Sequence, residues 1–206
     1  MKAPILKIDD EIFIDNYLSC DKFSNFKITV KENFIFKKDV VSFDSCEVVK
    51  LDFTKCQIKK LEFIDCKIID CDFSNLEFEE SIFKRCEFIG CKMLGVDFVK
   101  FTLADVLFKD CILRYSSFIN SKLKDSKFDK CDCSDSSFFD IVSNKIEVND
   151  VNFANCQFYN DDFSTVDFSN SNIDNITTDL KSIKKIIVNQ DQAIALAALL
   201  DITVKM

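Results

Sequence analysis

The sequence predicts a solenoid, a rod built by stacking one short unit, and three observations lead to this fold class. A large residue returns at every fifth position from Phe43 to Phe138, and 12 of these 20 positions hold Phe while 7 hold aliphatic side chains. Neither the helix period of about 3.6 residues nor the strand period of about 2 fits this spacing. Gly (2) and Pro (1) are scarce, so residues of other types must form the corners.

Residues 1–40 are interpreted as an irregular N-terminal coil or cap. The five-residue phase can be followed back through Phe13, Leu18, Phe23 and Ile28, and it is lost at positions 33 and 38. Segments 5–14 and 34–36 have the composition of strands. An atypical first coil is expected, because the open end of a solenoid has to be protected against edge pairing.

Residues 41–180 repeat a five-residue unit whose rule is visible in Cys71–Asn75: small, acidic, aromatic, small hydroxyl, polar. This pattern resembles the pentapeptide-repeat family. The resemblance implies an all-β, right-handed quadrilateral β-helix with four pentapeptides per coil. Residues 41–175 would then form 27 pentapeptides, or nearly seven coils. The spacing itself predicts only which two positions of each five point inward and which three point outward.

The cysteines follow the same phase. Nine of the 11 occupy the position two before a central residue, where other units hold Ser, Val, Leu or Ile. A free Cys packs as a small hydrophobe, so interior packing in a reducing cytosol is favoured over a disulfide framework. There is no Cys-x-x-Cys pair and no His, which argues against a zinc or redox site.

Two departures from the pattern lie inside the repeat. Phe101 puts a large ring at the small inward position, which predicts a local widening of the coil and not a site. Residues 139–150 have Ser143 and Val148 as central residues, so one coil is poorly filled. The phase survives this segment, which leaves two alternatives, a slightly distorted coil or a projecting loop.

Residues 181–206 are predicted to end the repeat with a helix and a short strand. Asn189 is a candidate helix N-cap, and Gln192 three residues later completes a capping box. The helix would cover about 190–200, followed by a strand at Ile202 and Val204. Most of its circumference is apolar, so it must be buried, either as a lid on the last coil or against a second copy of the chain.

This tail resembles the C-terminal end of the Qnr-type proteins, the quinolone-resistance branch of the family, and particularly the chromosomal members from Gram-positive bacteria. The residues that resemble this tail are segment 188–197, the Leu-rich turn after it and Ile202–Val204. It implies a homodimer through the C-terminal helix, with an interface formed by Ile194, Ala197, Ala198, Leu200 and Ile202. Asp201 stands where relatives usually have Gly, so the helix end lacks the usual left-handed residue.

The sequence offers no catalytic constellation. Without His there is no Ser-His-Asp or Cys-His arrangement, and there is no phosphate-binding loop, dinucleotide fingerprint or calcium loop. We therefore expect no catalytic residue, no metal and no cofactor. The longest apolar run, 193–200, is too short to span a bilayer, and the N-terminus lacks the apolar core of a signal peptide, so a cytoplasmic protein is expected.

Charge is unevenly distributed. The chain carries −8 overall, which argues against direct binding of nucleic acid, while residues 131–180 hold ten acids against the single base Lys145. Asp179 is one of the ten, and the other nine are candidate partner-binding residues: Asp132, Asp135, Asp140, Glu147, Asp150, Asp161, Asp162, Asp167 and Asp174. Simple solubility is the alternative explanation for this acidity.

The Qnr-type resemblance implies a DNA-mimicking protein that binds the bacterial type II topoisomerases DNA gyrase and topoisomerase IV and protects them from fluoroquinolones. A rod with regularly placed negative charge can compete for a basic DNA-binding surface. The alternative is a generic pentapeptide-repeat scaffold, or an immunity protein with another protein partner.

Overall fold

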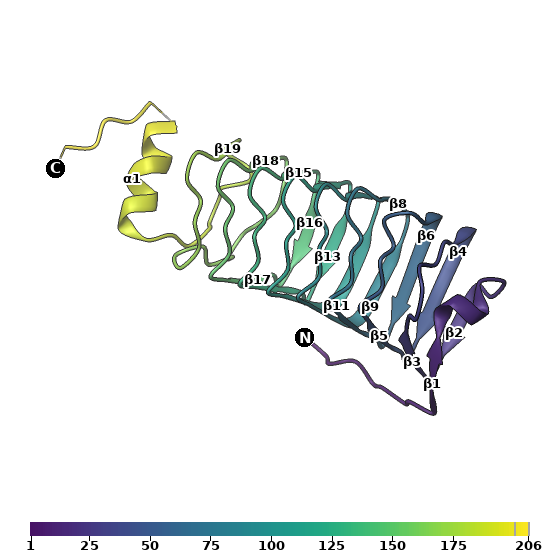
Figure 1. The fold of residues 1–206 in the computed structure, drawn as a ribbon. Helices are drawn as coiled ribbons and strands as arrows, with labels where there is room; N and C mark the ends of the chain where they lie inside the picture. Colours follow the sequence, from purple (N-terminus) through teal and green to yellow (C-terminus); the bar gives the residue numbers. More distant parts are fainter. Residues whose placement is uncertain (200, 206) are drawn as a thin grey trace.

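The structure is a computed structural model that describes residues 1–199 and 201–205. These residues form an all-β solenoid of about 8 turns with a single short helix at its C-terminal end (Figure 1). Strands pair in parallel with the strand one coil further on, and the register joins residues 20 apart, as in Phe43 with Phe63. Twenty residues are four pentapeptides, so each coil has four sides. The predicted fold class is confirmed.

The strands of the described residues form two sheets. The larger sheet contains β1 (Asp10–Phe13), β2 (Lys22–Ser24), β3 (Phe26–Thr29), β4 (Lys37–Asp44), β5 (Glu47–Val49), β6 (Gln57–Ile64), β7 (Lys67–Ile69), β9 (Ile82–Ile89), β11 (Thr102–Lys109), β13 (Lys122–Lys124), β14 (Lys127–Asp129), β16 (Val142–Asn144) and β17 (Glu147–Asn149). The smaller sheet contains β8 (Glu77–Glu79), β10 (Asp97–Val99), β12 (Ser117–Ile119), β15 (Ser137–Phe139), β18 (Gln157–Tyr159) and β19 (Thr177–Thr178). The larger sheet covers two adjacent sides of the rod. The third side belongs to the larger sheet at β4 and β6 and to the smaller sheet from β8 onward.

The fourth side, which we call the turn side, has no extended strands between Asp52 and Asn172. Its coils are joined there by single parallel bridges, such as Asp52 with Asp72 and Asp132 with Asn152. A tight turn follows each bridge, and a side chain before the turn stabilises it: Asp72 Oδ1 accepts the backbone N–H of Ser74 at 2.9 Å. This is the hydrogen bond that makes Asp and Asn favourable at turns.

Stacked rings fill the interior. Phe43 and Phe63 lie with ring centroids 4.8 Å apart, and Phe98 and Phe118 lie 4.6 Å apart, both pairs nearly parallel. The central residues predicted from the phase, Phe73, Phe98 and Phe128 among them, are almost completely buried. Offset stacking at this separation adds to the stabilisation that comes from burying the rings.

The corners explain the scarcity of glycine. Most corners contain one residue with positive φ, two positions after the central residue. This residue is usually Asp, Asn or Lys, as at Asp70 (φ 53°), Asn75 (φ 58°) and Lys130 (φ 54°). Asn and Asp adopt this left-handed conformation more readily than other non-glycine residues. Gly90 and Gly95, the two glycines of the chain, also occupy such corners, each with φ 63°.

Side chains at the small inward position form hydrogen bonds with the backbone of neighbouring coils. The Cys86 thiol donates to the carbonyl oxygen of Phe63 at 3.3 Å, and the Ser81 hydroxyl accepts the N–H of Leu61 at 2.8 Å. Ten of the 11 cysteines are buried and all are free thiols. Burial raises the pKa of Cys71 and Cys86, which disfavours the reactive thiolate. Phe101 also fits inward, with its ring at the edges of Phe83 and Phe98.

The N-terminal coil differs from the sequence-based tracing. Ile12 and Ile14 are buried, whereas Phe13 is half-buried and Leu18 is exposed. The reason is that β1 pairs with β3 at an offset of 16 residues, Ile12 opposite Ile28, so the phase shifts by one. A 3-10 helix, η1 (Ile14–Tyr17), follows β1, and segment 34–36 is not a strand although both of its Phe rings are buried.

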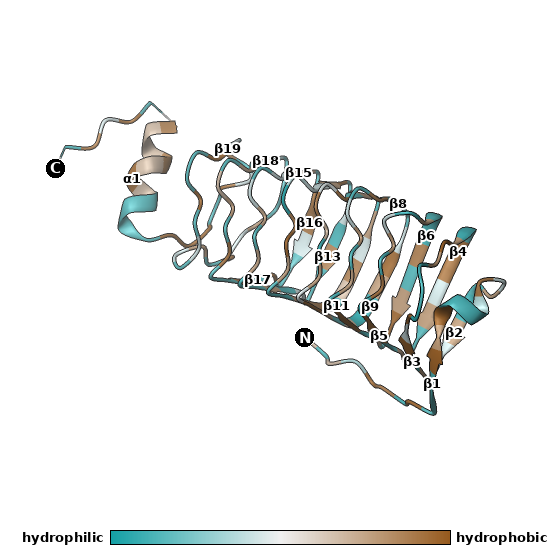
Figure 2. Cartoon of the chain, in the orientation of Figure 1, coloured by the Kyte–Doolittle hydropathy of each residue, from teal (hydrophilic) through white to brown (hydrophobic). Residues whose placement is uncertain are grey.

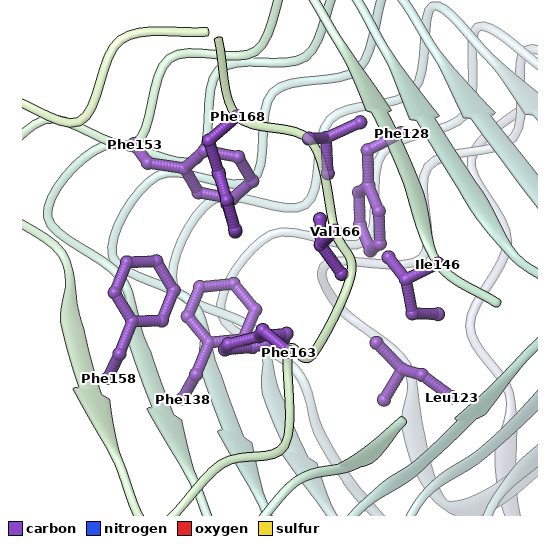
Figure 3. A pocket seen from close by; sticks show the side chains of 10 residues that line it. Leu123, Phe128, Phe138, Ile146, Phe153, Phe158, Phe163, Val166 and Phe168 are labelled. Atoms are coloured by element: carbon purple, nitrogen blue, oxygen red, sulfur yellow. The ribbon is translucent and has the colours of Figure 1, made fainter. Parts of the chain in front are cut away.

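Residues 139–150 form a regular coil. Strands β16 and β17 pair in register with β13 and β14, so the alternative of a projecting loop is wrong. The small central residues Ser143 and Val148 leave the coil underfilled, and an apolar cavity of about 10 Å³ lies there, with Phe128, Ile146 and Phe163 among the residues that line it (Figure 3). A cavity of this size and lining stays dry.

The C-terminal helix α1 (Gln190–Leu199) begins at the predicted N-cap, Asn189. The capping box is confirmed: Asn189 N–H donates to Gln192 Oε1 at 2.9 Å, and Gln192 N–H donates to Asn189 Oδ1 at 3.0 Å. Asp201 adopts the left-handed conformation itself (φ 57°), and its N–H donates to the Ala198 carbonyl at 3.1 Å. A Schellman-type helix end therefore forms without glycine.

The predicted strand at Ile202 and Val204 is wrong. Both side chains are exposed and residues 202–205 have no strand pairing. Helix α1 leads the chain away from the last coil, and the tail beyond it points into solvent (Figure 1). The first turn of α1 is hydrophilic and its remainder is apolar (Figure 2). Within the described residues no side chain of α1 is fully buried.

Candidate functional site

The candidate site is the acidic segment 131–180, whose exposed acids lie on three sides of the rod and at its corners. Asp140, Glu147, Asp150, Asp162, Asp167 and Asp174 are exposed, and Asp132 and Asp135 are half-buried. Glu147 lies on the larger sheet, and Asp167 lies in the same column one coil beyond it. Asp132 and Asp174 lie on the turn side, and Asp135, Asp140 and Asp150 lie at corners. The structure thus gathers these residues into an acidic belt over three sides and the corners of the rod, and not onto one face.

Asparagine side chains connect the acids of one coil to the next. Asn152 Nδ2 donates to Asp132 Oδ1 at 3.0 Å, Asn155 Nδ2 donates to Asp135 Oδ1 at 3.0 Å, and Asn160 Nδ2 donates to Asp140 Oδ1. Carboxylates stacked one coil apart would repel each other. The amide in the next coil takes the place of a second carboxylate, which avoids that repulsion and leaves the charge of the Asp in place.

Three of the predicted residues also stabilise turns by accepting hydrogen bonds. Ser134 donates through both its N–H and its hydroxyl to Asp132 Oδ1, and Ser164 does the same to Asp162 Oδ1. Asp167 Oδ1 accepts the N–H of Ser169 at 2.9 Å. The hydrogen bonds from Ser164 and Ser169 lower the pKa of Asp162 and of Asp167, which keeps both carboxylates charged.

Asp161 does not belong to the acidic surface, and its assignment there is wrong. Its side chain is fully buried at the small inward position, where Oδ1 accepts the N–H of Ile141 at 2.8 Å. Within the described residues its Oδ2 has no hydrogen-bond partner. Burial raises the pKa of Asp161 to about 8. The five-residue phase could have identified this position, because it is the register of the cysteines.

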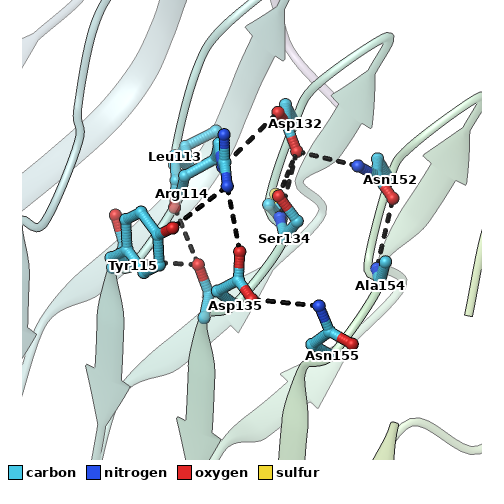
Figure 4. Close-up of polar contacts among 12 residues, drawn as sticks. Leu113, Arg114, Tyr115, Asp132, Ser134, Asp135, Asn152, Ala154 and Asn155 are labelled. Carbon is cyan, nitrogen blue, oxygen red and sulfur yellow. Dashed lines mark hydrogen bonds and ion pairs between the residues drawn. The ribbon is translucent and has the colours of Figure 1, made fainter. Parts of the chain in front are cut away.

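A basic residue interrupts the acidic belt at its N-terminal boundary (Figure 4). Arg114 Nη2 donates to Asp135 Oδ2 at 3.1 Å, and Arg114 Nε lies 3.9 Å from Asp132 Oδ2. The guanidinium lies over the ring of Tyr115, 5.1 Å from its centroid. Sequence reasoning missed this cluster, because the stacking of residues 20 apart has to be known before Arg114 can be placed beside Asp135.

The predicted dimer residues lie on and beyond α1. Ile194 and Ala197 are half-buried, while Ala198 and Ile202 are exposed. Leu200, the fifth, lies outside the described residues. The helix is anchored to the last coils, since Gln192 Nε2 donates to the carbonyl oxygens of Phe168 at 2.9 Å and Ser171 at 2.7 Å. Its outer surface therefore remains available to a second copy of the chain.

The remaining chemistry of the described residues is sparse. No three His, Cys, Asp or Glu side chains in residues 1–199 and 201–205 are grouped as a metal ion would require. Of the helices in this part of the chain, none has the length and apolar character needed to cross a membrane.

Comparison with known proteins gives one family match and several solved structures of low sequence identity. Residues 64–138 match the family model described as "Pentapeptide repeat region". None of the curated protein sequences compared with this chain matches it. Among solved structures, a trypsin-treated variant of QnrB1, described as a plasmid-mediated fluoroquinolone resistance protein, is 18% identical, with 97% of this chain and 96% of that chain covered and a TM-score of 0.48.

Two cyanobacterial pentapeptide repeat proteins are also similar. HetL from Nostoc sp. strain PCC 7120, described as involved in heterocyst differentiation regulation, is 8% identical over 90% of this chain and 89% of that chain, with a TM-score of 0.47. Rfr23 from Cyanothece 51142 is 9% identical over 60% of this chain and 91% of that chain, with a TM-score of 0.29. Residues 64–138 therefore match the pentapeptide-repeat model, and the same five-residue spacing and four-sided coil continue on both sides of this segment.

Proposed function

We propose that this protein is a DNA mimic of the Qnr type that binds the DNA-binding surface of DNA gyrase and topoisomerase IV and protects these enzymes from fluoroquinolones. Its action is surface complementarity and not catalysis, and it needs no cofactor. The acids of the belt meet Lys and Arg side chains of the enzyme, and binding disfavours the complex of enzyme, cleaved DNA and drug.

The observation that carries this proposal is the linear charge density of the acidic belt. Residues 131–180 span two and a half coils, about 12 Å at about 4.8 Å per coil. With Asp161 buried, nine acids and one lysine remain. This corresponds to one net negative charge per about 1.5 Å of rod, close to the one per about 1.7 Å of duplex DNA.

The belt lies next to the helix that is expected to hold the dimer. If two rods join through Ile194, Ala197, Ala198, Leu200 and Ile202, their acidic belts come together at the centre of a longer rod. The strongest negative field would then lie at the two-fold axis. A two-fold arrangement of this kind suits the two-fold symmetric DNA-binding surface of a dimeric topoisomerase.

The test is gyrase supercoiling inhibited by ciprofloxacin. Adding the protein is expected to restore supercoiling over a range of concentrations, whereas no rescue at any concentration would reject protection. A triple variant, Glu147→Gln, Asp150→Asn and Asp174→Asn, removes three exposed charges of the belt and is expected to weaken rescue. The matched control, Asp70→Asn, Glu77→Gln and Asp110→Asn, removes three exposed charges outside it and is expected to retain rescue.

One observation favours a second candidate, a pentapeptide-repeat scaffold or immunity protein with another protein partner. Asp132, Asp135, Asp140, Asp162 and Asp167 are all engaged by their own turns and asparagine ladders, as a purely structural and solubilising role would require. The size of the protein in solution separates the candidates, because a monomer favours the scaffold.

A further inference from the structure

One side of the rod carries no charged residue in three successive coils. Strands β12, β15 and β18 of the smaller sheet direct six side chains outward: Ser117, Ile119, Ser137, Phe139, Gln157 and Tyr159. We call this set the uncharged face. At the equivalent coils the larger sheet presents Lys122, Lys127 and Glu147, and the turn side presents Arg114 and Asp132.

The uncharged face consists of two in-register columns. Ile119, Phe139 and Tyr159 form one column, and Ser117, Ser137 and Gln157 form the other. The rings of Phe139 and Tyr159 are stacked, with centroids 5.6 Å apart and planes 9° from parallel. Tyr159 is 38% exposed, so part of its ring remains open to a partner. Ser137 beside Phe139 is small, and Gln157 beside Tyr159 is itself exposed.

Acidic corners border this face on both sides. Asp135 precedes β15 and Asp140 follows it, both with positive φ, and Asn155 and Asn160 occupy the same two corners one coil further on. An apolar, aromatic centre with a polar border is the composition of a protein interface. The border also favours a cationic partner, because the Asp140 carboxylate is exposed beside the rings, whereas Asp135 is already paired with Arg114.

We propose that the uncharged face is the side of the rod that contacts the topoisomerase, with Arg or Lys side chains of the enzyme stacking on Phe139 and Tyr159 beside Asp140. This inference rests on the proposed function, because it names the surface that contacts the enzyme after the acidic belt has attracted it. The belt, on the other three sides and at the corners, sets the rate and salt dependence of association, whereas the uncharged face supplies the contact that slows dissociation.

The experiment measures the affinity of gyrase for the double variant Phe139→Ala and Tyr159→Ala. Its matched control is Ile69→Ala and Ile89→Ala, a half-buried pair at the same pentapeptide position on the larger sheet, also one coil apart in register. The aromatic variant is expected to raise Kd about 10-fold, as for an interface anchor, and the control less than about 2-fold. Because no charge is removed, the ratio to wild type should stay constant as salt rises.

Each outcome decides the inference. If wild type binds gyrase and the Kd of the aromatic variant is within about 2-fold of the wild-type Kd, the uncharged face is not the contact surface. The proposed function then still stands. A wild type that fails to bind at low salt overturns both. Thermal unfolding verifies that the variants fold, and the single change Tyr159→Thr, which keeps a good strand former, replaces the double variant if the latter unfolds. Binding of naked duplex DNA by the same face would also contradict the inference.

Discussion

At the scale of single residues, Asp161 has the environment least suited to its chemistry. Its column holds Ser81 and Ser121 in earlier coils, and their hydroxyls accept the backbone N–H of the residue 20 positions before them. Asp161 Oδ1 does the same for Ile141, but a carboxyl group has a second oxygen, and Oδ2 is buried without a partner among the described residues. The column thus indicates a better residue for this position.

We predict that Asp161→Ser stabilises the fold. The serine hydroxyl keeps the hydrogen bond to Ile141 and removes the unsatisfied oxygen, a gain of about 1–3 kcal/mol in the free energy of unfolding. Urea unfolding followed by circular dichroism measures the change. The control is Ser121→Asp, which places a carboxyl in the same column and is expected to destabilise the fold.

The gain from Asp161→Ser should depend on pH. The pKa of Asp161 is raised from 3.8 to about 8 by burial, so the folded state binds the proton more tightly than the unfolded state. The stability that comes from this proton is complete below pH 4 and is lost as the pH rises to about 8. The variant should therefore exceed wild type more at pH 8 than at pH 5. An equal difference at both values would contradict the assigned pKa.

Phe108 tests the stacked interior. It lies between Phe88 and Phe128 with centroid separations of 5.1 Å to each, and its side chain is fully buried. Phe108→Ala is expected to cost about 3–5 kcal/mol of unfolding free energy. The outward Phe139→Ala serves as the control and should cost much less. Similar losses for the two variants in chemical denaturation would mean that the inward column is not the source of stability.

At the scale of elements, Gln192 supplies two of the hydrogen bonds that attach α1 to the last coils, beside one from Asn189 Nδ2 to the Ser169 carbonyl oxygen. Gln192 completes the capping box with Asn189 and also donates to the carbonyl oxygens of Phe168 and Ser171. Gln192→Ala should cost about 1–2 kcal/mol and speed amide hydrogen exchange in the helix. Gln190→Ala, an exposed change in the same turn, should leave exchange unchanged. Equal exchange in both variants would refute the attachment.

The same helix carries the predicted dimer contact. Ala198 and Ala195 are both exposed on α1, but only Ala198 belongs to the predicted interface. We expect Ala198→Glu to convert a dimer into a monomer, because two like charges would face each other across the axis. Ala195→Glu should remain dimeric. Analytical ultracentrifugation reads the mass directly, and a wild-type monomer would remove the dimer from the proposal.

Elements with a short-range sequence pattern could be predicted, and elements that depend on long-range pairing could not. The inward Phe columns and the Asn189–Gln192 capping box have short-range patterns, and both were predicted. The first coil was not, because a 16-residue offset between β1 and β3 cannot be read from a five-residue phase. The strand at 202–204 was predicted from its composition and from the resemblance of the tail, and it is wrong because this segment is exposed and unpaired.

At the scale of the whole molecule, the acidic segment was visible in the sequence but its geometry was not. Which acids adjoin each other depends on the 20-residue coil, so the ladder from Asp135 to Asn155 and the contact of Arg114 with Asp135 appear only in three dimensions. The coil also shows that the predicted acids lie on three sides of the rod and at its corners, so the fourth side, with Phe139 and Tyr159, differs in kind.

The central claim is that the acidic rod occupies the site where a topoisomerase binds DNA, and competition tests it most directly. A fluorescent DNA duplex bound to gyrase is titrated with the protein, and the released duplex is followed by anisotropy. The account predicts displacement at low salt that requires more protein as the salt concentration rises. Binding of the protein to gyrase without release of the duplex would contradict it.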